Sequence, residues 1–197
     1  MDIPQYINTY LSETAEIARG INQESVKKAL AILLELKAKA GRIFFLGVGG
    51  GAGTGSHSTN DFNKIAKIQT ICLSDNVSLL TALANDEGFE SIFKRQLEMQ
   101  KLSSRDCLFI YSVGGGSETT SKNLVLAIQY AKQVGAKIVG VVGSETGTTA
   151  KEADACIIIP CPEPKRKTAH TEDYQMIMDH LLSNLLAEIE NENTRQN

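Results

Sequence analysis

The sequence predicts a three-layer α/β sandwich with a five-stranded parallel sheet and additional helices at both ends of the chain. Two observations lead to this fold class. Five short runs of apolar, β-branched or aromatic residues recur along the chain, and segments with a helical period lie between them. Because the runs are apolar throughout rather than alternating, they are typical of strands buried on both faces.

Each predicted element occupies a definite range. The strands are expected to begin at five points along the chain, in runs that read IFFLGV from Ile43, IQTICL from Ile68, CLFIYSV from Cys107, KIVGVVG from Lys137 and ACIIIP from Ala155. Periodicity predicts helices over 56–67, 90–101 and 121–134, the last with Gly135 as its C-cap. Alternating strands and helices imply crossover connections and therefore parallel pairing.

Further helices are expected on both sides of the sheet. Two precede it, over 3–18 and 25–40, and one follows it, over 172–190, with Thr171 as its N-cap. Residues 1–190 are then one domain, in which 1–40 form a helical extension and 41–190 the α/β core with the last helix. The wholly polar sequence of 191–197 predicts a disordered tail.

Composition and charge argue against several classes of function. The 197 residues are 42% apolar and 22% charged with a net charge of −3, so nothing suggests nucleic-acid binding. Neither a signal peptide nor a membrane helix is expected, which predicts a cytoplasmic protein. The four cysteines lack C-x-x-C spacing and are interpreted as reduced core residues. The basic cluster Pro164–Lys167 is interpreted as a solvated loop, with contact to an anionic ligand as the alternative.

Two glycine-rich turns follow the first and third predicted strands. The first covers 47–55 and includes Gly49, Gly50 and Gly51; the second, SVGGGSETTS over 112–121, adds the hydroxyls of Ser112 and Ser117. Backbone amides at the carboxyl ends of parallel strands bind anions, and glycine lets a phosphate approach closely. The turns therefore indicate a phosphorylated small molecule, the alternative being that tight packing alone requires them.

A dinucleotide is a weaker hypothesis for the first turn. Gly47-x-Gly49-x-x-Ala52 matches the pattern, but the nearest acid after the second strand, Asp75, comes 28 residues after Gly47 instead of about 20. The chain also leaves no room for a second substrate domain. A P-loop is excluded because no Gly-Lys-Ser/Thr follows the glycines.

Two pairs of polar residues are candidates for chemistry. His57 and Asp61 lie at i and i+4 and share one face of a helix, where they could act as an acid/base pair or simply be exposed. Glu172 and His180 are eight residues apart, about 12 Å along a straight helix, so they could not easily bind one ion together. Either Glu172 lies in a non-helical turn, or the two residues serve different copies of a site shared between subunits.

The order of these motifs resembles the SIS (sugar isomerase) family, closest to the phosphoheptose isomerases. The resemblance covers nearly the whole chain through the blocks GVGGGAGTGSHSTNDF, LSDNVSLLTALANDEGFESIFKRQL, IYSVGGGS and HTEDYQMIMDHLL. It implies a flavodoxin-like sheet and interconversion of a ketose phosphate and an aldose phosphate through an enediol, with sedoheptulose 7-phosphate as the leading substrate. It also implies a homo-oligomer, most simply a tetramer, with sites shared between subunits.

The resemblance also implies roles for particular residues. Asp61 matches the family's general base and His180 its second acid/base. Some members bind zinc through the positions of His57, Asp61, Glu172 and His180, so zinc is a candidate cofactor here. Asp86 and Glu172 are further candidate substrate contacts, beside the phosphate-binding residues Gly49, Gly50, Gly51, Ser112 and Ser117.

The chain departs from the family pattern in several places. Asp61 stands for a glutamate, which withdraws the carboxylate by about 1 Å, and Glu172 stands for a glutamine. Val48 and Gly51 replace an asparagine and a serine, and the second turn is longer. These changes support an alternative, a non-catalytic SIS module that senses a sugar phosphate or binds a regulatory protein. Retention of both histidines and of two carboxylates favours an enzyme, and those four side chains suit zinc.

Overall fold

Five parallel strands form a single sheet at the centre of the computed structural model, which describes residues 1–196. The sheet order is β2-β1-β3-β4-β5, a flavodoxin-type order, so the predicted fold class is confirmed. All five strands lie within the predicted runs, at β1 Ile43–Gly47, β2 Thr70–Cys72, β3 Cys107–Ser112, β4 Lys137–Val142 and β5 Ala155–Ile158. The register aligns Ile43 with both Thr70 and Cys107.

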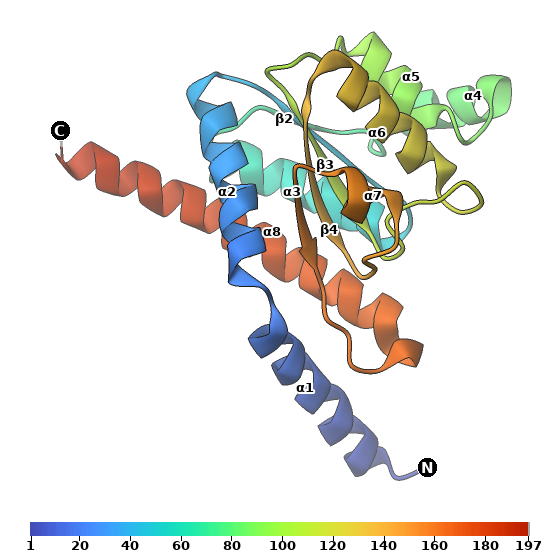
Figure 1. The fold of residues 1–197 in the computed structure, drawn as a ribbon, viewed down its shortest axis with the longest axis vertical. Helices are drawn as coiled ribbons and strands as arrows, with labels where there is room; N and C mark the ends of the chain where they lie inside the picture. The colour runs from blue at the N-terminus through green and yellow to red at the C-terminus, as the bar shows by residue number, and fades with distance from the viewer. Residues whose placement is uncertain (197) are drawn as a thin grey trace.

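Helices cover both faces of this sheet (Figure 1). Their bounds are α1 Ile3–Gly20, α2 Gln23–Ala38, α3 Gly50–Lys64, α4 Val77–Glu87, α5 Ile92–Met99, α6 Lys122–Val134, α7 Thr148–Glu152 and α8 Lys167–Gln196, with a 3₁₀ turn at Pro164–Arg166. Successive residues of each strand point to opposite faces, so Phe45 and Phe109 pack with α2, α3 and α8. Phe44 and Leu108 pack on the other face, with α4, α5 and α6.

Helix α3 begins at Gly50, six residues before the predicted start at Ser56. Gly49 turns the chain with a φ of +62°, a conformation that glycine adopts without strain. A Cβ on Gly51 would overlap the carbonyl oxygen of Tyr111 in β3, so this glycine lets the helix lie directly against the sheet. The glycines therefore belong to the helix itself, because close packing outweighs their low helix propensity.

The last helix is longer than predicted at both ends. It runs from Lys167 to Gln196, so Thr171 lies inside it and is not its N-cap. Pro164 opens the 3₁₀ turn that leads into α8, which explains the earlier start. The helix also continues past Glu190, and the tail expected over 191–197 is helical as far as Gln196; Asn197 lies outside the described residues.

Two helices were not predicted. Helix α4 follows Asn76, whose side chain accepts a hydrogen bond from the Leu79 amide at 3.0 Å, and it buries only Leu83. Because only one residue of α4 is buried, its sequence lacks a clear helical repeat of apolar residues, which is why this helix was not predicted. Helix α7 is a single short turn after β4. Within residues 1–196, no helix has both the length and the apolar character that crossing a membrane requires.

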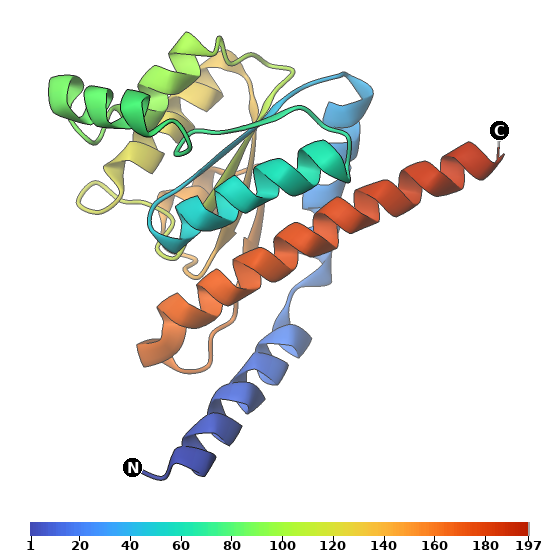
Figure 2. The ribbon, with the colours of Figure 1, turned by 180° about the vertical axis from the view of Figure 1, so that it is seen from behind.

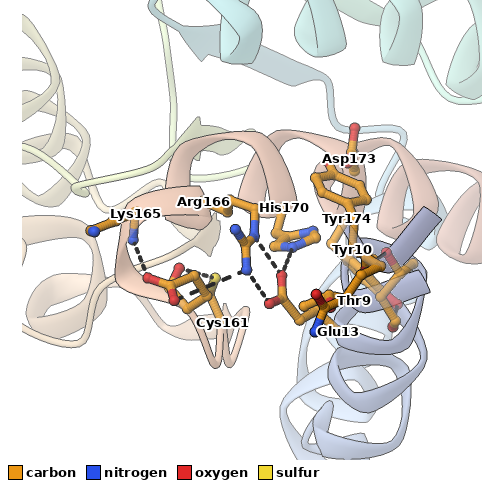
Figure 3. A network of polar contacts seen from close by, with 12 residues as sticks. Thr9, Tyr10, Glu13, Cys161, Lys165, Arg166, His170, Asp173 and Tyr174 are labelled. Carbon is orange, nitrogen blue, oxygen red and sulfur yellow. Dashed lines mark hydrogen bonds and ion pairs between the residues drawn. The ribbon is translucent and has the colours of Figure 1, made fainter. Parts of the chain in front are cut away.

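Helix α1 extends away from the sheet and contacts the start of α8 (Figures 1 and 2). Ile17 is its one buried residue among those described. Polar contacts hold the helix: Glu13 accepts hydrogen bonds from the guanidinium of Arg166, one at 2.7 Å, and its carboxylate lies 2.9 Å from Nε2 of the buried His170 (Figure 3). The Tyr10 ring packs against that of His170 in a tilted arrangement, with the ring centroids 4.4 Å apart, and the Tyr10 hydroxyl donates to Asp173 at 3.0 Å. The cluster Pro164–Lys167 is thus no solvated loop, because Arg166 anchors α1.

We expect the attachment of α1 to weaken in acid. The hydrogen bonds from Arg166, and secondarily His170, lower the pKa of Glu13 from 4.5 to about 2. A lowered folded-state pKa contributes stability above pH 4.5 that is lost as the pH falls toward 2. Hydrogen exchange of residues 3–20, corrected for intrinsic rates, should therefore lose protection over that range.

The matched variants are Glu13→Gln and Glu16→Gln, since Glu16 is an exposed carboxylate on the same helix. Glu13→Gln should leave α1 less protected at neutral pH and remove most of the acid dependence, whereas Glu16→Gln should behave like the unaltered protein. Equal protection in the two variants would contradict this account of the attachment.

Candidate functional site

Four polar side chains meet where α3 packs against α8, two helices that lie side by side (Figure 2). His57 and Asp61 come from α3, and Asp179 and His180 from α8. Each offers one nitrogen or oxygen atom, and these four atoms lie within 4.8 Å of one another. We call these residues the α3–α8 cluster.

Short distances link the members of the cluster. The Nε2 atoms of His57 and His180 are 3.1 Å apart, a hydrogen bond in which one ring donates and the other accepts. Oδ2 of Asp61 lies 3.4 Å from Nε2 of His57 and 3.6 Å from Nε2 of His180. Asp61 thus lies beside both imidazoles, within reach of a group held between them.

Burial differs sharply across the cluster. The imidazole side chains of His57 and His180 are 42% and 51% exposed, whereas the Asp61 side chain is 9% exposed and that of Asp179 is fully buried. The reason lies in helix packing: the next residue after Asp61, Phe62, enters the core beneath α3, and Asp179 follows the buried Met178 in α8. The histidines therefore face solvent and the carboxylates lie beneath them.

Asp179 is a buried acid without a hydrogen-bond donor of ordinary geometry on either carboxylate oxygen. Burial raises its pKa to about 6, the nearby Ser58 hydroxyl partly offsets the rise, and the charge of Asp61 adds to it. Ser58 itself hydrogen-bonds the Tyr111 hydroxyl at 3.0 Å. Burial raises the pKa of Tyr111 well above 10, so the phenol stays neutral beneath the cluster.

The structure brings together three of the four predicted metal-binding residues, His57, Asp61 and His180. Glu172 does not join them. It lies in the helical part of α8, so the alternative of a non-helical turn is wrong. Its carboxylate lies against Gly50 at the start of α3, where a Cβ on that glycine would overlap it. A carboxylate is favoured there by the positive end of the helix dipole.

Asp179 takes the fourth place in the cluster, and the sequence prediction missed it. The run MIMDHLL sets a charged residue beside His180 in the most apolar part of the last helix. Acids are rarely fully buried without a partner, so an aspartate in this apolar run already indicated a functional residue. Of these two adjacent residues, the prediction named only His180.

The second glycine turn is an ordered loop beside the β4–α7 connection. Gly115 and Gly116 have positive φ values of 76° and 79°, and their carbonyl groups accept hydrogen bonds from Thr149 and Thr148. Ser112 Oγ accepts from the Gly115 amide at 3.0 Å, which leaves its hydroxyl proton free to donate. Ser117 Oγ accepts from the Thr120 amide at 3.1 Å.

Asp86 lies apart from the cluster. It is exposed near the end of α4, and its carboxylate accepts a hydrogen bond of 2.8 Å from Asn85. Cys72 and Cys107 are buried core residues of β2 and β3, as predicted, whereas Cys156 in β5 and Cys161 beyond it are only partly buried; all four thiols are free in the described residues. Burial raises the pKa of Cys156 to about 12, which makes its thiol unreactive at neutral pH.

The fold and these turns define a class of protein, the doubly wound α/β domains that bind small molecules at the carboxyl ends of their strands. The family follows from comparison with known sequences. The SIS domain model matches residues 5–143, more than half of the chain, and the protein belongs to that family. Helix α8, with Glu172, Asp179 and His180, lies outside the matched segment.

Individual relatives extend the comparison to nearly the whole chain. It is 30% identical over 189 residues to a phosphoheptose isomerase of Geotalea daltonii, with 91% of this chain and 93% of the relative covered. It is 29% identical over 184 residues to the lincomycin biosynthesis protein LmbN of Streptomyces lincolnensis, with 89% of this chain covered but 66% of that protein.

A solved structure shows the same fold. The phosphoheptose isomerase from Neisseria gonorrhoeae superposes with a TM-score of 0.83 at 21% identity, covering 94% of this chain and 99% of that one. At that level of identity the likeness concerns the fold alone.

The approach of α3 to the sheet yields a prediction about stability. Gly51→Ala should destabilise the protein by about 1–3 kcal/mol or more, because the new Cβ meets backbone rather than a movable side chain. Gly53→Ala is the matched control in the same helix, since its Cβ would meet nothing within 4 Å. It should be neutral or stabilising by up to about 1 kcal/mol. Equal unfolding midpoints in urea would contradict this packing.

Proposed function

We propose that this protein is an aldose–ketose isomerase acting on a sugar phosphate, with sedoheptulose 7-phosphate as the leading substrate and a heptose 7-phosphate as the product. One observation carries the proposal: a buried carboxylate lies within 3.4 and 3.6 Å of two half-exposed imidazoles, those of His57 and His180. Proton transfer between adjacent carbons needs such a base beside such an acid. The relatives named phosphoheptose isomerase support the same activity.

In the proposed mechanism, Asp61 removes the proton from one of the two reacting carbons and returns it to the other. The electron pair of the broken C–H bond forms the C=C bond of an enediol, and the carbonyl pair moves onto its oxygen, which takes a proton. The reverse steps at the other carbon release a proton from its oxygen, so substrate and product are isomers and no oxidant is needed. His180, beside Asp61, transfers the proton on the oxygen atoms or assists ring opening. The side chain of Asp61 is one methylene shorter than the glutamate of the family. Its carboxylate is held in position because α3 packs tightly on the sheet.

The phosphate group fits the second glycine turn better than the first. At the start of α3, the carboxylate of Glu172 already lies against Gly50, and a second anion there would be repelled. The turn over 112–121 offers the hydroxyl proton of Ser112, and its one acid, Glu118, is exposed to solvent, which screens its charge. We therefore propose Ser112 and Ser117 as phosphate contacts, and Glu172 as a contact to sugar hydroxyls.

Zinc fits the cluster chemically, because imidazoles and carboxylates are ordinary zinc ligands and one buried carboxylate lacks a partner. His57, Asp61 and His180 would hold it. When bound, zinc would supply Lewis-acid stabilisation of the negative charge that develops on the substrate oxygens. The second glycine turn would still bind the phosphate through Ser112 and Ser117.

We also propose that the protein works as a homo-oligomer, most simply a tetramer, with a neighbouring copy completing each site. Helix α1 projects from the sheet with a stripe of exposed apolar residues, Ile3, Tyr6, Ile7 and Leu11. On α8, Ile177 and Leu181 are both 43% exposed beside the cluster. Four free thiols in the described residues fit a reducing compartment such as the cytoplasm.

The activity is tested by incubating the protein with sedoheptulose 7-phosphate in D₂O and following the sugar by NMR. We expect deuterium to enter the sugar and an aldose signal to appear. Asp61→Asn and His180→Gln should each lower turnover by about 10²–10⁴-fold, the usual contribution of an acid/base group, with substrate binding largely kept. Glu188→Gln, farther along α8, is the control and should be fully active.

Two results would contradict the proposal. If sedoheptulose 7-phosphate binds but neither exchanges nor isomerises, the protein is a sugar-phosphate sensor or uses another substrate. If turnover is near normal in both the Asp61 and His180 variants, the residues named here do not carry the reaction.

The assembly is tested by light scattering coupled to size-exclusion chromatography. Ile7→Asp places a charge in the apolar stripe of α1 and should dissociate the oligomer, because burying an unpaired charge costs several kcal/mol. Ser12→Asp adds the same charge at an exposed polar position of that helix and should leave the mass unchanged. A monomeric unaltered protein at all concentrations would disprove the shared site.

A further inference from the structure

The buried carboxylate of Asp179 plays no part in the proton transfers proposed above. Its side chain is fully buried, neither oxygen accepts a hydrogen bond of ordinary geometry, and Oδ2 lies 3.9 Å from Nε2 of His57. A buried carboxylate persists when it is paired with a cation, coordinates a metal or is protonated. The surroundings of Asp179 decide between these possibilities.

Two carboxylates lie together in the α3–α8 cluster, and among the described residues the only side chains ion-paired with them are His57 and His180. Two carboxylates, Asp61 and Asp179, share the cluster with two imidazoles whose Nε2 atoms are 3.1 Å apart. A divalent cation bound by two neutral imidazoles would balance both carboxylates.

The geometry and access also suit a cation. One ligand atom from each residue lies within 4.8 Å of the others, a spread that a single ion can bridge after small side-chain rotations. The pairs come from adjacent stretches of two packed helices, so the backbone holds the four groups in place. The half-exposed imidazoles leave an open path from solvent to the cluster.

We propose that Asp179 is the fourth protein ligand of a divalent transition-metal site that one chain builds alone, with His57, Asp61 and His180. Glu172, which lies against Gly50, is not part of this ligand set. Two imidazoles and two carboxylates favour zinc, and cobalt is its spectroscopic substitute. The inference deepens the proposed function, on which it rests for the use of the site; occupancy itself is measured without substrate.

The first test is a Co²⁺ titration of the chelator-treated, full-length protein. We expect one Co²⁺ per chain and a visible absorption band of tetrahedral intensity. Asp179→Asn should weaken the affinity by about 100-fold or more and change the band, since a ligand is lost. Glu172→Gln is the matched control, an acid-to-amide change on the same helix, and should keep the Co²⁺ affinity and the absorption band of the unaltered protein.

The second test separates metal binding from a purely structural role of Asp179. In chelator, Asp179→Asn should unfold at the same or a higher temperature than the unaltered protein, because it removes an unpaired buried charge. In excess zinc, the unaltered protein should gain stability and Asp179→Asn should gain little. If Asp179→Asn lowers the unfolding temperature equally with and without zinc, the residue is structural and the proposal fails.

Other outcomes are equally decisive. No cobalt bound by the unaltered protein would overturn the site. Loss of cobalt binding in Glu172→Gln but not in Asp179→Asn would overturn the ligand set. Full isomerase activity in protein shown to be metal-free and unable to bind metal would overturn this inference and leave the isomerase intact. One tightly bound cobalt per chain without any turnover would support the site while the proposed function fails.

Discussion

The α3–α8 cluster depends on the close packing of α3 against both the sheet and α8, which lies beside it on the same face of the sheet. His57 and Asp61 lie on α3, while Asp179 and His180 lie more than a hundred residues later on α8. Only the contact between the two helices brings them together. That contact depends in turn on Gly51, because a side chain there would push α3 off the backbone of β3. Gly51 therefore allows α3 to pack closely on β3, and this packing in turn positions His57 and Asp61.

The same contact buries polar groups that a stable core would avoid. Asp61, Ser58 and Asp179 all lie beneath the exposed imidazoles, and Tyr111 extends from β3 to hydrogen-bond Ser58. Buried carboxylates weaken the folded state unless charge or hydrogen bonds compensate them. The aromatic cluster around Phe45, Phe62 and Phe109 packs directly under this region and supplies apolar burial that offsets the cost. A site of this kind is stable because rigid elements surround it.

Glu172 makes the two glycine-rich turns at the carboxyl ends of the strands differ in charge. Its carboxylate lies at the positive end of α3, while the turn over 112–121 keeps the hydroxyl donor of Ser112, and its one acid, Glu118, is exposed to solvent. A bound sugar phosphate would then place its phosphate toward the second turn and its reacting carbons toward the cluster. At residue 172 this chain has a glutamate where the family pattern has a glutamine. The added charge affects where an anion can bind and leaves the α3–α8 cluster unchanged.

The sequence alone determined the fold class, the five strands and the pairing of His57 with Asp61, because these follow from local patterns: continuous apolar runs and a four-residue spacing. It placed the start of α3 and both ends of α8 wrongly, since propensity and capping signals gave way to tertiary packing at Gly51 and to the entry through Pro164. Only the tertiary structure showed that the fourth residue of the cluster is Asp179 and not the predicted Glu172. The physical reason is that the angle at which α3 crosses α8 selects which turn of α8 faces His57, and no local pattern contains that angle.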